Sequence, residues 1–163
     1  EAFPLRVLPY LDQELADLRG NAKPVARRRA LDACRQASAS NPEDWVLHDL
    51  TARLLNGLDE YAAAEAEWRQ VARLIPHAAR PHSEIGKSQA QQGKTQEALA
   101  SFGKALELNP DWVDAHVGLG DLHSRQGTRS QAVRHFRRAL SLDPTRTEVA
   151  NQLTRLTQAA REP

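Results

Sequence analysis

The residues of this sequence best suited to chemistry are three histidines, His48, His82 and His116, which recur every 34 residues. Imidazole is a common zinc ligand, and every ligand must reach to about 2 Å from the ion. If the spacing reflects a structural repeat, equivalent positions lie roughly 10 Å apart, so this set cannot chelate one ion. His116 and His123 are also more widely spaced than the four-residue pair typical of a helical metal site. We therefore expect no metal and no cofactor, and a packing role at the interface between repeats. A pH-sensitive interface is the alternative.

No other residues have the spacing of catalytic groups. An enzyme needs a nucleophile beside its base, or paired carboxylates in a cleft, and no set of residues here has a recognisable spacing for either. Gly118 and Gly120 resemble part of a phosphate-binding loop, but no strand precedes them. We interpret both as glycines that allow close helix packing, and we expect no catalytic residue in this chain.

Arginine clusters are the remaining charged motifs, at positions 27–29 and at positions 134, 137 and 138. The favoured interpretation is a solvated outer face, and the alternative is an electrostatic contact with RNA, acidic lipid or a protein partner. The 163 residues contain 22 Lys and Arg against 21 Asp and Glu, a formal net charge of +1. This balance lacks the basic excess of nucleic-acid-binding proteins, so we expect no nucleic-acid partner.

The composition also bears on the compartment. No stretch approaches the roughly 20 apolar residues needed to cross a bilayer, and no signal-peptide core stands at the start. We expect a soluble segment without membrane insertion, with cytoplasm and periplasm both open. Cys34 is the single cysteine, which excludes an intrachain disulfide. Methionine is absent even from position 1, so we expect a processed chain or a piece of a longer protein.

The elements that position these residues recur with the same period of 34. Proline stands at positions 42, 76, 110 and 144, each time after a run typical of a helix, which proline ends because it lacks the amide hydrogen. A small residue and, four positions later, a bulky one keep the same register. These rows are Ala30, Ala64, Ala98 and Ala132, and Cys34, Trp68, Phe102 and Phe136. Small residues let helix axes approach while bulky ones fill the groove, so the rows predict packed helix pairs.

Turn signals separate the two helices of each unit. Gly93 and Gly127 are suited to the C-terminus of the first helix, and Asp59 stands at the equivalent position of the earliest unit. Thr128 with Gln131 matches the capping box that begins a helix.

The pattern of each unit resembles the tetratricopeptide repeat, whose consensus is Trp-x2-Leu-Gly-x2-Tyr, then Ala-x3-Phe, then Pro. The last unit fits best, with Leu119 and Gly120 followed by Ala132, Phe136 and Pro144. The unit before it repeats the match, and the first unit departs more. The resemblance implies an all-α fold, a right-handed α-solenoid of helix-turn-helix repeats with about three full repeats.

This resemblance divides the chain into three parts. Residues 1–41 form a degenerate N-terminal helix pair that caps the array, with its first helix over 5–18. Residues 42–144 hold three repeats, at 42–75, 76–109 and 110–144. Residues 145–163 form a C-terminal capping helix, because a terminal unit must present one face to water.

In tetratricopeptide repeat proteins, the first helices of successive units line a concave groove that holds an extended or helical peptide. The resemblance therefore assigns partner binding to the inner-face positions of these helices. By the 34-residue shift these candidates are Val46, Asp49, Arg53, Asn56, Arg80, Ser83, Lys87, Gln91, Asp114, Val117, Asp121 and Arg125.

Charge changes sign along this set of candidates. Arg53, Arg80 and Lys87 are basic, whereas Asp114 and Asp121 are acidic. We expect a protein or peptide ligand of mixed charge, bound with an affinity on the order of micromolar. Family members that bind the acidic carboxyl terminus of a chaperone use a face rich in Lys and Asn, and the acidic residues here disfavour that ligand.

The leading functional hypothesis is a scaffold or adaptor that binds another protein within a larger complex. The alternative is the substrate-presenting region of a larger enzyme, such as a glycosyltransferase or hydroxylase, whose catalytic domain lies outside these residues. RNA binding through the arginine clusters is a third hypothesis, and it predicts association that weakens steeply with salt.

Overall fold

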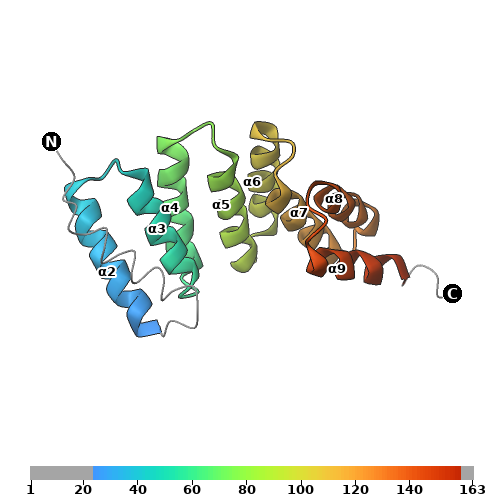
Figure 1. Ribbon diagram of the computed structural model, residues 1–163, viewed down its shortest axis with the longest axis horizontal. Helices are drawn as coiled ribbons and strands as arrows, with labels where there is room; N and C mark the ends of the chain where they lie inside the picture. The colour runs from blue at the N-terminus through green and yellow to red at the C-terminus, as the bar shows by residue number, and fades with distance from the viewer. Residues whose placement is uncertain (1–23, 159–163) are drawn as a thin grey trace. The chain divides into compact units, whose positions relative to one another are not determined.

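The computed structural model describes residues 24–158, and all regular secondary structure within that range is helical (Figure 1). The helix predicted over residues 5–18 lies outside the described residues. The helices are α2 (Pro24–Ser40), α3 (Trp45–Asn56), α4 (Tyr61–Leu74), α5 (Ala79–Gln91), α6 (Thr95–Leu108), α7 (Val113–Arg125), α8 (Arg129–Leu142) and α9 (Thr147–Gln158).

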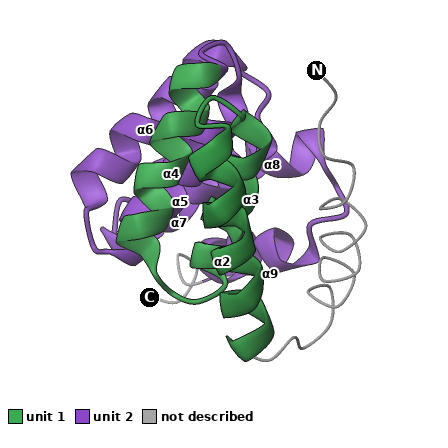
Figure 2. Cartoon of the chain, turned by 90° about the vertical axis from the view of Figure 1, so that its left-hand side faces the viewer, with its two compact units in different colours: residues 1–74 green, residues 75–163 purple. Residues whose placement is uncertain are grey.

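These helices fall into two compact units that divide between Leu74 and Ile75 (Figure 2). Unit 1 contains α2, α3 and α4, and unit 2 contains α5 to α9. In unit 1, α3 packs on α4. In unit 2, α5 packs on α6 and α7 on α8, while α5 also contacts α7. The first helices of the two pairs in unit 2 are therefore neighbours. Each pair lies within one of the repeats predicted from the sequence.

The two rows of small and bulky residues form the core of each helix pair. Ala64, Ala98 and Ala132 are 0 % exposed. The bulky residue one helical turn later is also buried, as Trp68, Phe102 or Phe136. The small side chain lets the helix backbones approach, and the aromatic ring fills the space beside it.

The two glycines of α7 mark the closest approach between helices in unit 2. A Cβ atom added at Gly118 would lie 2.3 Å from Cζ of Phe102, and one at Gly120 would lie 2.4 Å from Cε1 of Phe136. Each ring therefore lies directly against the backbone of α7. The interpretation of these residues as packing glycines is confirmed.

The turn inside each pair contains one residue with a left-handed backbone. Its φ is 76° at Gly93, 74° at Gly127 and 61° at Asp59. The capping box predicted at Thr128 is wrong, because this residue makes no side-chain capping bond to α8. Its hydroxyl instead donates to the carbonyl oxygen of His123 at 3.0 Å, and so satisfies a carbonyl at the end of α7.

His48 and His116 occupy equivalent positions and make equivalent hydrogen bonds. Nε2 of each lies 3.0 Å from the carbonyl oxygen of the proline six residues earlier. Since a carbonyl only accepts, Nε2 carries the proton. Nδ1 faces the second helix of the same pair, at 2.6 Å from Oε2 of Glu67 for His48 and 3.1 Å from Nδ1 of His135 for His116. These histidines therefore tie together parts of one helix pair, rather than packing between repeats as the sequence led us to expect.

The two partners give these pairs opposite responses to pH. Burial lowers the pKa of His48, but the hydrogen bonds and charge of its partners outweigh burial and leave it raised. Burial, followed by the nearby charge of His116, lowers the pKa of His135 to about 4. The stabilisation from His48 is present below its unfolded pKa of 6.5 and is lost as pH rises through the raised value. His135 opposes folding increasingly as pH falls from 6.5 toward 4, because the unfolded chain binds its proton more readily.

Replacing Gly120 with Val should destabilise the protein by about 1–3 kcal/mol or more, because the new side chain would overlap the ring of Phe136. Gly103 on α6 is the matched control, since a Cβ there meets no atom within 4 Å. Gly103→Ala should stabilise the protein by about 0.5–1 kcal/mol, as alanine restricts the unfolded chain. Urea unfolding followed by circular dichroism measures both changes, and shifts of the same sign would contradict this packing.

The partner of His48 is Glu67 and that of His116 is His135. Placing the other kind of partner in either pair should reverse the effect of that pair on stability as pH changes. Relative to the native chain, His135→Glu should gain on the order of 1–2 kcal/mol between pH 8 and pH 5, because His116 then faces a carboxylate. The reciprocal Glu67→His should lose stability over the same range, because it places two imidazoles together in unit 1. Thermal unfolding at several pH values measures this, and parallel profiles for the three chains would refute the assignment.

Candidate partner-binding face

In unit 1, the predicted binding residues lie on α3. Val46 is 50 % exposed, and Arg53 is exposed as well. Asp49 is buried, with Oδ2 at 3.7 Å from Nη1 of Arg53. Asn56 is partly buried near the end of the helix. Val46 and Arg53 are therefore the residues of this group that present the most surface to a partner.

In unit 2, the predicted residues of α5 differ in accessibility. Arg80 and Gln91 are exposed, and Lys87 is partly buried. Ser83 is 0 % exposed. A partner cannot reach Ser83 in this structure, so Ser83 is not part of the candidate binding face.

On α7, the four predicted residues lie at or near the surface. Arg125 is exposed, while Asp114, Val117 and Asp121 are partly buried. Burial, reinforced by the charge of Glu148, raises the pKa of Asp121 and outweighs the opposing effects of the nearby Arg125 charge and of the hydrogen bond with Gln152. The negative charge of this carboxylate is therefore less firmly held than that of an exposed aspartate.

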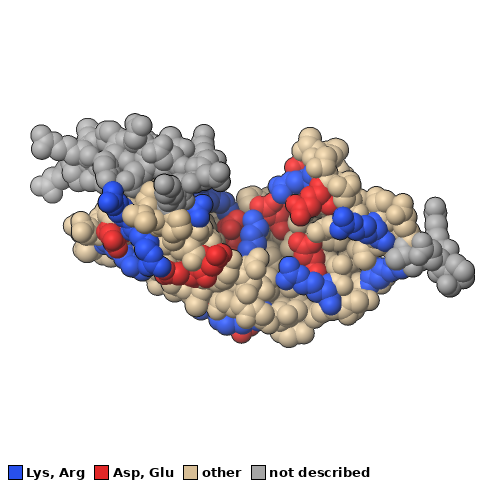
Figure 3. Space-filling model, turned by 90° about the horizontal axis from the view of Figure 1, so that it is seen from below, with Lys and Arg blue, Asp and Glu red and all other residues tan. Residues whose placement is uncertain are grey.

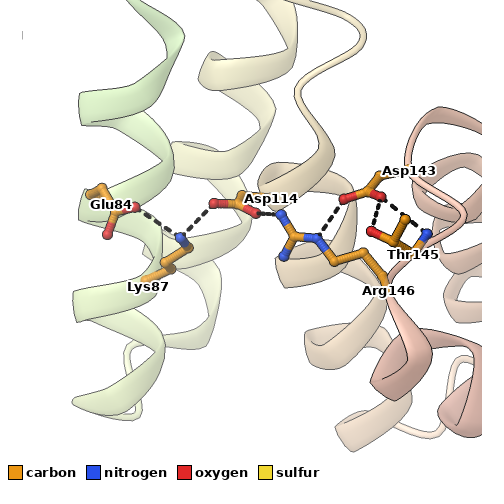
Figure 4. A network of polar contacts seen from close by, with 6 residues as sticks. All are labelled: Glu84, Lys87, Asp114, Asp143, Thr145 and Arg146. Atoms are coloured by element: carbon orange, nitrogen blue, oxygen red, sulfur yellow. Dashed lines mark hydrogen bonds and ion pairs between the residues drawn. The ribbon is translucent and has the colours of Figure 1, made fainter. Parts of the chain in front are cut away.

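An ion-pair network joins α5 to α7 and to the loop before α9 (Figure 4). Nζ of Lys87 lies 2.8 Å from Oε1 of Glu84 and 2.9 Å from Oδ2 of Asp114. Nη2 of Arg146 lies 2.8 Å from Oδ1 of Asp114, and its Nε lies 3.0 Å from Oδ2 of Asp143. Sequence analysis identified Lys87 and Asp114 as ligand contacts and missed the other three residues. Their contacts are made in the folded chain, and Arg146 is 32 residues from Asp114.

Both central charges of this network are stabilised by their neighbours. Burial lowers the pKa of Lys87, but the carboxylates of Glu84 and Asp114 outweigh burial and raise it. Burial raises the pKa of Asp114, but Lys87 and Arg146 outweigh burial and lower it. Each group is charged at neutral pH and is already paired within the protein. A partner that used either charge would first have to compete with these contacts.

Four of the predicted residues surround one small hollow, and we call the surface formed by Lys87, Gln91, Asp121 and Arg125 the α5–α7 face. The hollow has a volume of about 90 Å³. The rest of its lining is apolar or small and consists of Ala90, Phe102, Gly118 and Leu122. Sequence analysis did not assign these four to the site, although the absent side chain at Gly118 is the signal that could have indicated an opening.

A second and larger hollow of about 470 Å³ shares Asp121 and Arg125 with the first. The remaining lining comes from α7, α8 and α9 and consists of Ser124, Arg129, Glu148, Gln152, Arg155 and Leu156. None of its three arginines forms an ion pair within 4.0 Å to any residue of the described range. The residues of α9 escaped the prediction because the sequence marks that segment only as a closing helix.

The described residues provide neither a metal site nor a membrane-spanning helix. Within residues 24–158, no group of three or more His, Cys, Asp or Glu side chains is placed to hold a metal ion. Acidic and basic side chains are interspersed on the face shown in Figure 3. No helix in the described part of the chain is both long and apolar enough to span a membrane.

Comparisons with known proteins match this architecture. A family model described as "TPR repeat" matches residues 86–127, and one described as "Tetratricopeptide repeat" matches residues 115–150. No curated protein matches the chain in sequence.

Several solved structures are similar to the chain in fold. A crystal structure of MamA has a TM-score of 0.74 at 15 % identity, over 83 % of this chain and 79 % of that one. MamA 41-end from Desulfovibrio magneticus RS-1 has a TM-score of 0.71 at 18 % identity, over 85 % and 76 %. The first TPR of Spaghetti (RPAP3) bound to the HSP90 peptide SRMEEVD has a TM-score of 0.67 at 17 % identity, over 72 % and 94 %.

At these identities the likeness shows the fold alone. It agrees with the all-helical architecture of the described residues. The predicted fold class, an all-helical repeat solenoid, is confirmed. Tetratricopeptide repeat models thus match residues 86–150 of this chain.

Proposed function

We propose that this chain is a protein-interaction scaffold that binds a segment of another polypeptide on the α5–α7 face of unit 2. The observation that carries the proposal is the convergence of Lys87, Gln91, Asp121 and Arg125 around one hollow. These four positions were predicted from the resemblance to the tetratricopeptide repeat together with the 34-residue shift. Their arrangement around an opening is what a peptide-binding surface requires.

The fold supports the same proposal in general terms. One similar solved structure, the first TPR of Spaghetti (RPAP3), contains a bound peptide. Stacked helical repeats bind partners through extended surfaces because each repeat adds another row of accessible side chains. A non-catalytic role is part of the proposal, and the partner would be held by contacts on the face rather than transformed there.

The proposed partner carries charges of both signs. Two of the charged residues predicted to contact it, however, already pair with each other. Lys87 and Asp114 largely compensate each other, at 2.9 Å. Arg125 is exposed and forms no ion pair with a residue in the described range. It is therefore the charge on the α5–α7 face most available to a ligand. Val46 and Arg53 on α3 are proposed as a contact site of unit 1 in its own right.

Arg125→Gln should weaken binding of a protein partner about tenfold, because it removes an available charge from the α5–α7 face. Arg134→Gln is the matched control, since Arg134 is also exposed but lies on α8. A partner captured from native lysate would be identified, purified and titrated against the three chains by isothermal calorimetry. We expect an affinity on the order of micromolar for the native chain and for the control.

Equal binding by the native chain and Arg125→Gln would contradict the assignment of this face. Capture that disappears after nuclease treatment would instead indicate RNA binding and would contradict the proposed function. Circular dichroism of each variant verifies that the helical fold is retained.

A further inference from the structure

The small hollow on the α5–α7 face has an apolar floor. The ring of Phe102 lies against the backbone of Gly118, where a Cβ would approach Cζ to 2.3 Å. Phe102 is only 1 % exposed, so the ring forms the base of the hollow and does not project from it. Ala90 and Leu122 complete the apolar part of the lining. Contact with this floor removes apolar surface from water, which favours an apolar group.

The size of this hollow limits what can enter it. Its volume is about 90 Å³, whereas a cavity that holds benzene measures roughly 150 Å³. The small volume therefore favours an aliphatic side chain over an aromatic ring.

Charge around the adjoining hollow selects the neighbouring group of the ligand. Arg125, Arg129 and Arg155 line it without ion pairs to described residues, against the carboxylates of Asp121 and Glu148. Nη2 of Arg129 is buried without a hydrogen-bond partner among the described residues. A buried donor left unpaired is costly, and a carboxylate is the acceptor that guanidinium groups bind most strongly. The larger hollow is therefore complementary to an acidic side chain.

We propose that unit 2 recognises an extended internal segment of its partner in which a Val, Ile or Leu enters the small hollow and an Asp or Glu two residues away binds the arginines of the larger one. The two hollows share Asp121 and Arg125, so two side chains on the same face of one peptide can occupy both. In an extended strand, side chains two residues apart lie on the same face and are separated by about 7 Å along the chain. This inference rests on the proposed function and names the class of ligand.

The test uses random 12-residue peptides displayed with both ends joined to a carrier protein, selected on the full 163-residue chain. We expect enriched sequences to share an aliphatic residue with an acidic residue two positions away. A synthetic consensus peptide, acetylated and amidated at its ends, should bind with a Kd on the order of micromolar. Replacing its aliphatic residue with Ala, or its acidic residue with the amide, should weaken binding about five- to tenfold.

Two variants of the chain connect each ligand group to its hollow. Ala90→Leu should fill the small hollow and weaken binding at least tenfold, whereas Ala100→Leu, at an exposed position of α6, should not. Arg155→Gln should weaken binding of the consensus peptide severalfold and should have little effect on its amide analogue. Arg155 is exposed, so this second variant tests the proposal even if Ala90→Leu perturbs the core.

The outcomes separate this inference from the proposed function. Enriched peptides without a shared aliphatic residue, or unchanged binding by Ala90→Leu, would overturn the ligand class and leave the scaffold proposal intact. Unchanged binding when the acidic residue of the consensus peptide is replaced with its amide would also overturn it, because no side-chain carboxylate would then be recognised. A library that yields no binder would count against both proposals.

Discussion

The ring of Phe102 lies directly against the backbones of two first helices, and the architecture of unit 2 depends on this contact. An added Cβ would approach ring atoms to 3.0 Å at Gly86 on α5 and to 2.3 Å at Gly118 on α7. The Phe102 side chain of α6 therefore sets the distance from α6 to α5, its partner in the pair, and the distance from α6 to α7 of the next pair. Phe136 repeats the contact at Gly120. Close packing of this kind tolerates little change of volume, which makes the glycines as important as the rings.

The same contact produces the opening to which we assign ligand recognition. Because Gly118 has no side chain, α7 leaves the Phe102 ring as the floor of a hollow between charged residues of α5 and α7. The contact between Phe102 and Gly118 that packs the helices together thus also places apolar surface at the base of a hollow on a polar face. In the proposed site, helix packing and ligand recognition both depend on Gly118.

The charged residues on and around the α5–α7 face form two groups. One group makes ion pairs within the protein, and the other is available to a ligand. Lys87 of α5 and Arg146 of the loop before α9 both pair with Asp114 of α7, and burial makes these contacts costly to break. Arg125, Arg129 and Arg155 have no such partners among the described residues. Residue type alone does not distinguish the two groups, because both contain charged residues on the polar side of amphipathic helices. The distinction depends on which opposite charge lies within reach.

Much of this protein is determined by its sequence because the same packing problem is solved repeatedly. The 34-residue period, the small and aromatic rows and the packing glycines each report contacts between residues close in the chain or in register. That information is sufficient for the helix pairs and for the packing between them.

Only the tertiary structure decided what the chemically active side chains do. His48 faces Glu67 and His116 faces His135, so the pKa of His48 is raised whereas the pKa of His135 is lowered. Ser83 shares the register of the binding face but is fully buried. The larger hollow combines α7 with α9, which the repeat pattern does not relate. The physical reason is that ion pairing, burial and hollows depend on distances between residues far apart in sequence, and no periodicity reports those distances.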